Sequence, residues 1–398
     1  MDGMAEQNVV PSSLLRTSFK VEDMKYRKLN DLDIEVSLLG LGTLRFPTHP
    51  SGELDYDRSV KLIRRAIDKG VNYLDLGVNY FNGESEKVVG IALKDGYRDK
   101  VIVTDKILVR LLNKPEDVEN TFESQLQKLG IDYFDFYFIH NVNRASWKTV
   151  KEYKILEFLE KKKKEGVVKH IGFSYHDDVA FFKEIVDAYP WEMCQIQLNY
   201  MDTEFQAGVE GLKYAAERGM NISIMEPLKG GCLARKAPDS VQKIWDDSGE
   251  NMTRAEWAYR WVADFPEVST VLSSFASEDL LDEAIAVFSN IEPESLTQKQ
   301  HETIKTVADE FRSKIKYPCT ECRYCMPCPM DIDIPHLIRL YNELYMYEDT
   351  EKVDWEYGLW FRNKQNQFDC VKCGKCEKSC PQGLKIMDIM EKSKAELA

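Results

Sequence analysis

Short apolar runs rich in β-branched and aromatic residues alternate with longer amphipathic segments along most of the chain. The segments between the runs have helical periodicity, as at 59–69 and 118–129, where apolar residues fall on one face. The pattern therefore predicts a repeated strand–helix unit. Eight apolar runs precede residue 290, at 37–42, 71–76, 101–104, 134–139, 168–173, 193–198, 222–225 and 269–272.

A repeated strand–helix unit builds either an open doubly wound sheet or a closed barrel. Eight strands in roughly 290 residues suit the α/β class of (β/α)8 TIM barrels. A dinucleotide-binding open sheet would carry G-x-G-x-x-G after its first strand, whereas no third glycine follows Gly40 and Gly42 at that spacing. We expect a barrel over residues 24–316 and an N-terminal extension over 1–23.

The strand pattern stops near residue 290, where a helix is expected over 296–315. Eight of the 10 cysteines follow residue 318, so we expect a second, small domain over 317–398. A further helical stretch at 335–346 predicts that this domain is mainly helical. Its cysteines form two groups that each end in Cys-Pro, namely Cys319, Cys322, Cys325 and Cys328, then Cys370, Cys373, Cys376 and Cys380.

Composition and charge narrow the environment of the protein. Of the 398 residues, 43% are hydrophobic, and the net charge of -14 disfavours binding to nucleic acid or to anionic membranes. Asp2 and Glu6 stand where a secretory signal carries positive charge, and the apolar run 133–139 is too short to span a membrane. We expect a cytoplasmic protein whose cysteines bind metal rather than form disulfides.

Three cysteines separated by two residues each, followed by a Cys-Pro, are typical of [4Fe-4S] ligation, and this chain has the arrangement twice. Structural zinc is the alternative, since paired C-x2-C elements also bind zinc. The repetition favours two [4Fe-4S] clusters. In the first group two residues rather than three precede Cys328. Cys194 and Cys232 lie apart from both groups and are expected to be buried thiols.

The tail resembles a two-cluster ferredoxin, in which the cysteine before proline binds the other cluster. The resemblance implies a crossed arrangement. One cluster would take Cys319, Cys322, Cys325 and Cys380, and the other Cys370, Cys373, Cys376 and Cys328.

Polar residues at the carboxyl ends of barrel strands are the first candidates for catalysis. Asp75 ends the second expected strand, Tyr80 follows it, Lys106 ends the third and His140 ends the fourth. A lysine beside a tyrosine stabilises the phenolate and is expected to lower the tyrosine pKa, which suits proton transfer to a carbonyl oxygen. Asp75 would hold the lysine, and His140 would orient the carbonyl.

These four residues, in this order, resemble the catalytic tetrad of the aldo/keto reductases. Gly172-Phe173-Ser174, Gln195-x3-Asn199 and Pro227-Leu228-x-Gly230 are similar to later strand ends of that family. The resemblance covers roughly residues 24–290, and together with the cysteine tail the chain looks like an iron-sulfur branch of the family.

The resemblance also implies a nicotinamide cofactor, with Ser174 and Gln195 holding its carboxamide. Lys229 or Arg235 would supply charge for the 2′-phosphate of NADPH. Several positions depart from the family pattern and argue against NADPH, namely Tyr175, Met225, Glu278 and Asp279. A flavin stays open, because barrels bind FMN without a linear motif.

Three arginines follow expected strands and would line the barrel mouth: Arg45, Arg110 and Arg144. Their convergence would suit a substrate that carries a carboxylate or phosphate.

Two classes of function follow. The first is an oxidoreductase that reduces a carbonyl or oxidises an alcohol, with two clusters exchanging electrons with a carrier such as ferredoxin. Stepwise reduction through a ketyl radical is a variant, because each cluster moves one electron whereas hydride transfer moves two. The second is an electron-transfer or partner-binding protein with a degenerate nicotinamide site.

Overall fold

A computed structural model describes residues 24–319, 321, 323–361 and 367–397; the expected extension 1–23 and Cys322 lie outside the described residues. Eight parallel strands close into a barrel in the order β10-β3-β4-β5-β6-β7-β8-β9. The strands are β3 Leu39–Gly42, β4 Tyr73–Asp75, β5 Ile102–Leu108, β6 Phe134–Val142, β7 Val168–Tyr175, β8 Met193–Gln197, β9 Asn221–Met225 and β10 Thr270–Ser273.

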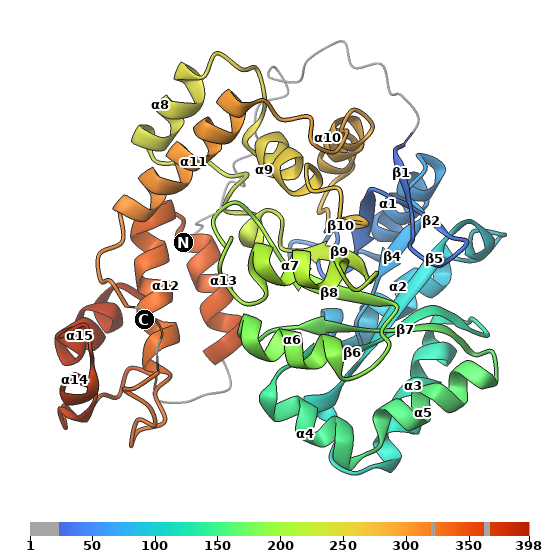
Figure 1. The fold of residues 1–398 in the computed structure, drawn as a ribbon, viewed down its shortest axis with the longest axis horizontal. Helices are drawn as coiled ribbons and strands as arrows, with labels where there is room; N and C mark the ends of the chain where they lie inside the picture. The colour runs from blue at the N-terminus through green and yellow to red at the C-terminus, as the bar shows by residue number, and fades with distance from the viewer. Residues whose placement is uncertain (1–23, 320, 322, 362–366, 398) are drawn as a thin grey trace.

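Helices surround the barrel, and the tail helices stand beside one rim of it (Figure 1). The barrel helices are α1 Tyr56–Asp68, α2 Glu84–Ala92, α3 Glu116–Leu129, α4 Arg144–Glu152, α5 Ile155–Lys164, α6 Val179–Asp187, α7 Gly208–Ala216, α8 Asp239–Asp247, α9 Arg254–Ala263, α10 Glu278–Phe288 and α11 Gln298–Ser313. The tail helices are α12 Ile334–Tyr347, α13 Thr350–Phe361, α14 Lys375–Ser379 and α15 Ile386–Leu397.

The barrel interior is a small apolar core, closed at one end by an antiparallel hairpin of β1 Tyr26–Lys28 and β2 Glu35–Ser37. The alternation of side chains along a strand sends every second residue inward, so β6 contributes Phe136 and Phe138. The hairpin contributes Leu29 and Val36. Apolar side chains fill this end of the barrel. A site built from polar side chains is therefore expected at the opposite end, where the strands finish.

The tight interior requires a glycine on β7. A Cβ atom on Gly172 would lie 2.4 Å from Phe138 Cε1 and 2.5 Å from the carbonyl oxygen of Met193. Without it, the Phe138 ring packs directly on the β7 backbone.

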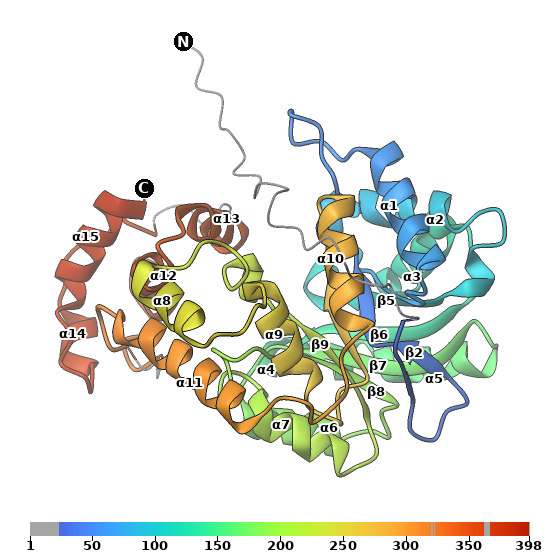
Figure 2. The ribbon, with the colours of Figure 1, turned by 90° about the horizontal axis from the view of Figure 1, so that it is seen from above.

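Helix α12 joins two hydrophobic cores. Its first turns, with Leu337 and Tyr341, belong to the tail core, whereas Met346 and Tyr347 at its end belong to the core around the barrel. The rings of Tyr347 and Phe311 of α11 have centroids 5.0 Å apart. The tail is therefore packed on the barrel through shared apolar surface; in Figure 2 helices α8, α11, α12 and α13 lie together at that side.

The eight expected strands, and the expected helices at 59–69, 118–129, 296–315 and 335–346, are confirmed with small shifts of their ends. Strands β5 and β6 run beyond the expected 104 and 139 because polar residues near their ends stay in the ladder. The hairpin β1–β2 was not expected, since its strands have only three residues each. Among the described helices, none is long and apolar enough to cross a bilayer.

We expect Gly172→Ala to destabilise the barrel by about 1–3 kcal/mol, because the added methyl group forces Phe138 or the β8 backbone to move. Gly42→Ala is the matched control: its Cβ would lie 2.8 Å from Ser274 Oγ, a hydroxyl that can rotate away. Chemical denaturation of both variants measures the difference, and equal stabilities would contradict the packing argument.

Candidate functional site

The four tetrad candidates meet at the carboxyl end of the barrel. Asp75 ends β4, Lys106 lies in β5 and His140 lies in β6. Tyr80 opens the short 3-10 turn η2 Tyr80–Gly83 that follows β4. Neighbouring parallel strands finish at the same rim, so residues distant in sequence share one site.

A buried ion pair forms the floor of this site. Lys106 Nζ lies 2.7 Å from Asp75 Oδ1 and donates a hydrogen bond of 2.5 Å to the carbonyl oxygen of Leu76. Lys106 is 0% exposed and Asp75 is 4% exposed. Burial opposes the lysine charge, but Asp75, Tyr80 and Asp105 together outweigh it, so the pKa of Lys106 is raised. The lysine therefore stays cationic.

Tyr80 lies above this pair because the chain turns sharply after β4. A Cβ on Gly77 would lie 2.8 Å from Tyr80 Cζ, so only glycine leaves room for the ring there. Phe81 and Asn82 have φ values of 47° and 54°, a left-handed geometry that is rare for a phenylalanine. The turn brings the Tyr80 ring centroid to 5.5 Å from Lys106 Nζ and 6.0 Å from the His140 ring.

The expected lowering of the Tyr80 pKa is wrong in its net direction. Burial raises the pKa of Tyr80 to about 12, although Lys106 lowers it as expected. The loss of hydration destabilises the phenolate by more than the charge of Lys106 stabilises it. Tyr80 is consequently a protonated phenol at neutral pH, which is the form that donates a proton.

Two histidines lie near Lys106. Burial, Lys106, His176 and Arg110 hold the pKa of His140 well below its ordinary value, so the ring is neutral, and its buried Nδ1 has no partner among the described residues. His176, just after β7, has its Nδ1 3.2 Å from Gln206 Oε1, and burial lowers its pKa to about 4. His176 was not among the residues predicted from the sequence, although its place two residues after Ser174 at a strand end could have revealed it.

Ser174 and Gln195, the candidate residues for binding nicotinamide, already have hydrogen-bond partners within the protein. Ser174 Oγ accepts a hydrogen bond from the backbone N–H of Asn141 at 2.8 Å. Gln195 Nε2 donates to Asp75 Oδ1 at 2.8 Å, so Gln195 extends the floor of the site. Ser174 still has a hydroxyl proton for a carboxamide, so the residues present fit a nicotinamide ring only in part.

Lys229 lies at the barrel–tail contact rather than at an open rim. Its Nζ lies 2.8 Å and 3.0 Å from the Asp202 carboxylate and 3.7 Å from Glu343 Oε1 of α12. The expected role of Lys229 as a charge for a cofactor phosphate thus meets a competing carboxylate from the tail.

The three arginines do not converge. Arg45 donates to the carbonyl oxygen of Gly230 at 2.8 Å and stacks on Trp355 of α13, with 4.6 Å between Cζ and the ring centroid. Arg144 pairs with Asp177 and Asp178 at 2.7 Å and 2.6 Å. Arg110 is exposed, and its positive charge lowers the pKa of His140. Arg110 is therefore the arginine whose charge acts on the site.

The tail contains two cavities lined by cysteines. One is lined by Cys325, Cys328, Cys370, Cys373 and Cys376, and the other by Cys319, Cys325 and Cys380. Each cysteine that precedes a proline lines the cavity of the other group. Among the described residues, which exclude Cys322, no three ligand side chains are gathered closely enough for a single metal ion. Cysteine-rich cavities with apolar walls fit iron-sulfur clusters.

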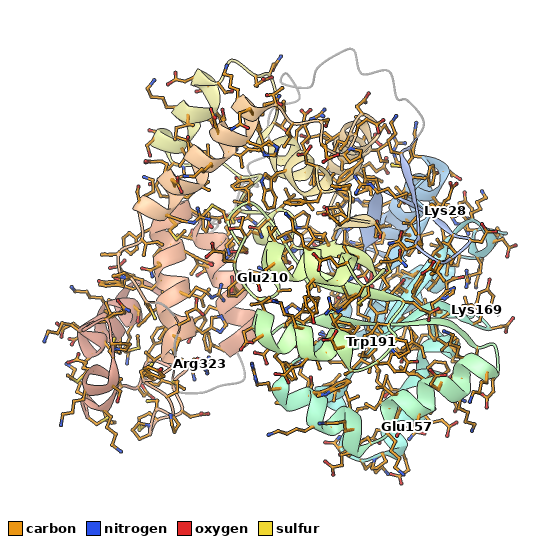
Figure 3. The ribbon with its side chains drawn as sticks, in the orientation of Figure 1. Lys28, Glu157, Lys169, Trp191, Glu210 and Arg323 are labelled. Carbon is orange, nitrogen blue, oxygen red and sulfur yellow. The ribbon has the colours of Figure 1, made fainter. Side chains whose placement is uncertain are left out.

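The second cavity has a basic rim. Arg323 lines it and lies 3.4 Å from Asp333 Oδ1. Figure 3 shows Arg323 in the tail, near the start of α12.

Comparison with protein families matches residues 38–309 to the aldo/keto reductase family and residues 318–384 to the 4Fe-4S dicluster domain. The chain belongs to the aldo/keto reductase family. This reductase is 28% identical over 234 residues to the NADH-specific methylglyoxal reductase of Escherichia coli (strain K12), covering 53% of this chain and 69% of that protein.

Two solved structures share the fold of the reductase. The holo form of an aldo-keto reductase from Bacillus halodurans superposes with a TM-score of 0.60 at 23% identity, covering 71% of this chain and 96% of that one. An aldo-keto reductase from Klebsiella pneumoniae in complex with NADPH gives 0.58 at 20% identity, covering 72% and 95%. Both align with less than three quarters of this chain.

The pKa values predict a broad pH profile for carbonyl reduction by this reductase. Tyr80 must be protonated, and its raised pKa keeps it so until near pH 12, while His140 and His176 stay neutral at neutral pH. We expect kcat for reduction to be level between about pH 6 and about pH 9 and to fall only in stronger alkali. Alcohol oxidation should instead rise with pH, because it needs the phenolate. A reduction profile that falls near pH 7 would assign the proton to a histidine.

Proposed function

We propose that the protein is an iron-sulfur oxidoreductase that reduces a carbonyl, or oxidises an alcohol, at the carboxyl end of its barrel. The observation that carries this proposal is the gathering of Tyr80 and His140 over the buried Asp75–Lys106 pair. A proton donor thus lies beside a fixed positive charge, which is the arrangement that protonates a developing alkoxide.

Each residue of the site has a separate task. Tyr80 donates the proton to the carbonyl oxygen, and Lys106 stabilises the phenolate that remains. Asp75 and the carbonyl of Leu76 hold Lys106 in place. Neutral His140 would orient the carbonyl oxygen through a hydrogen bond. A nicotinamide nucleotide, if bound, would supply a hydride, that is, both electrons and the hydrogen that goes to carbon, while Tyr80 supplies the proton that goes to oxygen.

We assign one cluster to Cys319, Cys322, Cys325 and Cys380, and the other to Cys370, Cys373, Cys376 and Cys328. The cysteines that line the two cavities support this crossed set, although Cys325 lines both. Such clusters supply electrons one at a time.

The domain boundary at residues 316 and 317 is supported by the ranges of the two family matches.

The tail and the barrel point to different sources of electrons. A one-electron carrier such as ferredoxin would serve the clusters, and the oxygen sensitivity of such clusters would suit an anaerobic, cytoplasmic setting. NAD(P)H is the donor favoured by the relatives, since the Escherichia coli enzyme is named as NADH-specific and the Klebsiella pneumoniae structure is a complex with NADPH. Ser174, Gln195 and Lys229 would hold its nicotinamide and phosphate; a flavin has no assigned residues.

A second candidate function is electron transfer or partner binding by the tail, with a degenerate nicotinamide site. The contact between Lys229 and Glu343 favours it, because a tail carboxylate occupies the neighbourhood of a candidate phosphate partner. Stepwise reduction through a ketyl radical, with Tyr80 as proton donor, would need no nicotinamide nucleotide. It is therefore compatible with an intact tetrad and with a Lys229 charge that is not available to a cofactor phosphate.

The substrate is a small molecule, and Arg110 would attract an anionic one. Arg45 and Arg144 are less suited to this role because their guanidinium groups already have partners within the protein. Methylglyoxal, the substrate named for the Escherichia coli relative, is the first carbonyl to test.

Tyr80→Phe should lower the rate of carbonyl reduction at least about 100-fold, because the variant has no acidic proton to give. The assay uses methylglyoxal with either nicotinamide nucleotide, and separately with a reduced viologen dye. Tyr97→Phe, a change to a tyrosine bonded to Asp68 at the surface, is the matched control and should keep full activity. Full activity in the Tyr80 variant would remove the tyrosine from the mechanism.

Anaerobically purified protein should contain about eight iron and eight sulfide per chain, as two [4Fe-4S] clusters require. Cys373→Ser or Cys319→Ser should each remove roughly half of the iron, because each cysteine lines a different cavity. Cys194→Ser, at a buried barrel thiol, should leave the iron unchanged. Stoichiometric zinc without broad visible absorbance would refute the clusters.

A further inference from the structure

In many eight-stranded barrels the loops after the seventh and eighth strands bind phosphate. Here these loops follow β9 and β10. The loop after β9 contains the 3-10 turn η5 Lys229–Gly231, in which Gly230 and Gly231 have φ values of 69° and 97°. It also carries two cations, Lys229 and Arg235. We call this segment, residues 226–235, the phosphate-corner loop.

The tail covers this loop with helices α12 and α13. Two contacts are ionic: Glu343 Oε1 lies 3.7 Å from Lys229 Nζ, and Asp349 Oδ1 lies 2.7 Å from Arg235 Nη1. The Lys352 side chain adds bulk, since its carbons lie 3.7 Å and 3.8 Å from the Cβ position of Gly230. The loop is thus contacted along its length by the segment 343–356, which we call the strap.

A third contact ties the strap to another barrel loop. Trp355 stacks on Arg45, and the same guanidinium bonds to the carbonyl oxygen of Gly230. Arg45 follows β3, the first barrel strand, which is paired with β10. The strap therefore spans from the loop after β9 to the loop after β3, across the rim where the barrel closes.

The charges inside the strap hold it in this shape. Lys352 pairs with Glu343 and, at 2.6 Å, with Glu356, and it is 3% exposed. Arg339 bonds to Glu343 at 3.0 Å and also to Glu356. Buried charges of this kind must stay paired, because an unpaired one is costly. The carboxylates facing the loop are accordingly held in fixed positions.

Most of the carboxylates on the loop's cations come from the tail. Arg235 pairs with Asp349 and Glu351 of the strap. Lys229 pairs more closely with Asp202 of the barrel itself than with the tail. A dinucleotide phosphate placed on this loop would therefore compete chiefly with the carboxylates that the docked strap presents to Arg235.

We propose that the strap competes with nicotinamide nucleotides for the phosphate-corner loop, so that the docked tail excludes the nucleotide and a bound nucleotide displaces the strap. The inference rests on the proposed function, of which it specifies the regulation. The reductase would then use the nucleotide only when the strap is released, and the apparent affinity is reduced by the fraction of molecules that are docked.

The test measures binding of NADH and of NADPH by calorimetry, under anaerobic conditions, to the full-length holoprotein. The variant Asp349→Asn, Trp355→Ala removes the shorter of the two ion pairs of Arg235 with the strap and the ring that stacks on Arg45, and leaves Glu351 at 3.4 Å from Arg235. Asparagine still caps α13, where Asp349 accepts from the N–H of Lys352. Asp354→Asn, an exposed residue of the same helix, is the matched control.

We expect the double variant to bind at least one of the two nucleotides about tenfold or more tightly than wild type, and the control to match wild type. Equal affinities in all three proteins would overturn the proposal, as would no binding to any of them. Iron content and circular dichroism check that the variants are folded.

Hydrogen exchange on the wild-type protein gives a second readout that needs no variant. Because coupling is reciprocal, a saturating nucleotide should speed amide exchange in α13. Slower exchange there would overturn the proposal. Both measurements are made without turnover, so an inactive barrel would leave them unaffected and would contradict only the proposed function.

Discussion

The structure depends on stabilising one positive charge inside the barrel. Lys106 has no exposed surface, so its ammonium must find oxygen ligands within the protein, and it finds them at Asp75 and at the carbonyl of Leu76. Both ligands lie at the end of β4, which pairs with β5 in a register that places Asp75 opposite Thr104. Closure of the barrel thus brings anion and cation together. Gln195, from the far side of the barrel, completes the carboxylate's hydrogen bonds.

This pair explains the character of the tyrosine above it. A positive charge near Tyr80 favours the phenolate, yet the enclosed surroundings favour the phenol more, and the net effect is a raised pKa. Tyr80 consequently keeps its proton at neutral pH, and the charge of Lys106 stabilises the phenolate once the proton has left. The same enclosure keeps His140 neutral. Burial here has opposite effects on a tyrosine and a histidine, because it disfavours whichever form is charged.

A second set of charges joins the barrel to its tail. Helix α12 begins in the tail core and ends in the barrel core, so the two parts share one helix rather than a free linker. Around it, Glu343, Lys352 and Glu356 form a buried network that reaches Lys229 of the barrel. Lys229, whose closer partner is Asp202 of the barrel, also contacts this network, and this connects the question of the electron donor to the position of the tail.

The sequence by itself determined the barrel, the cysteine groups and the order of the tetrad residues. These follow from local periodicity and spacing, which are properties of the linear sequence and do not depend on contacts between distant segments. Only the tertiary structure decided the net pKa of Tyr80, the position of His176 near Lys106, the separation of Arg45, Arg110 and Arg144, and the partners of Lys229. Each of these depends on which groups approach from distant segments and on how much water they exclude, and a pattern along one chain contains neither quantity.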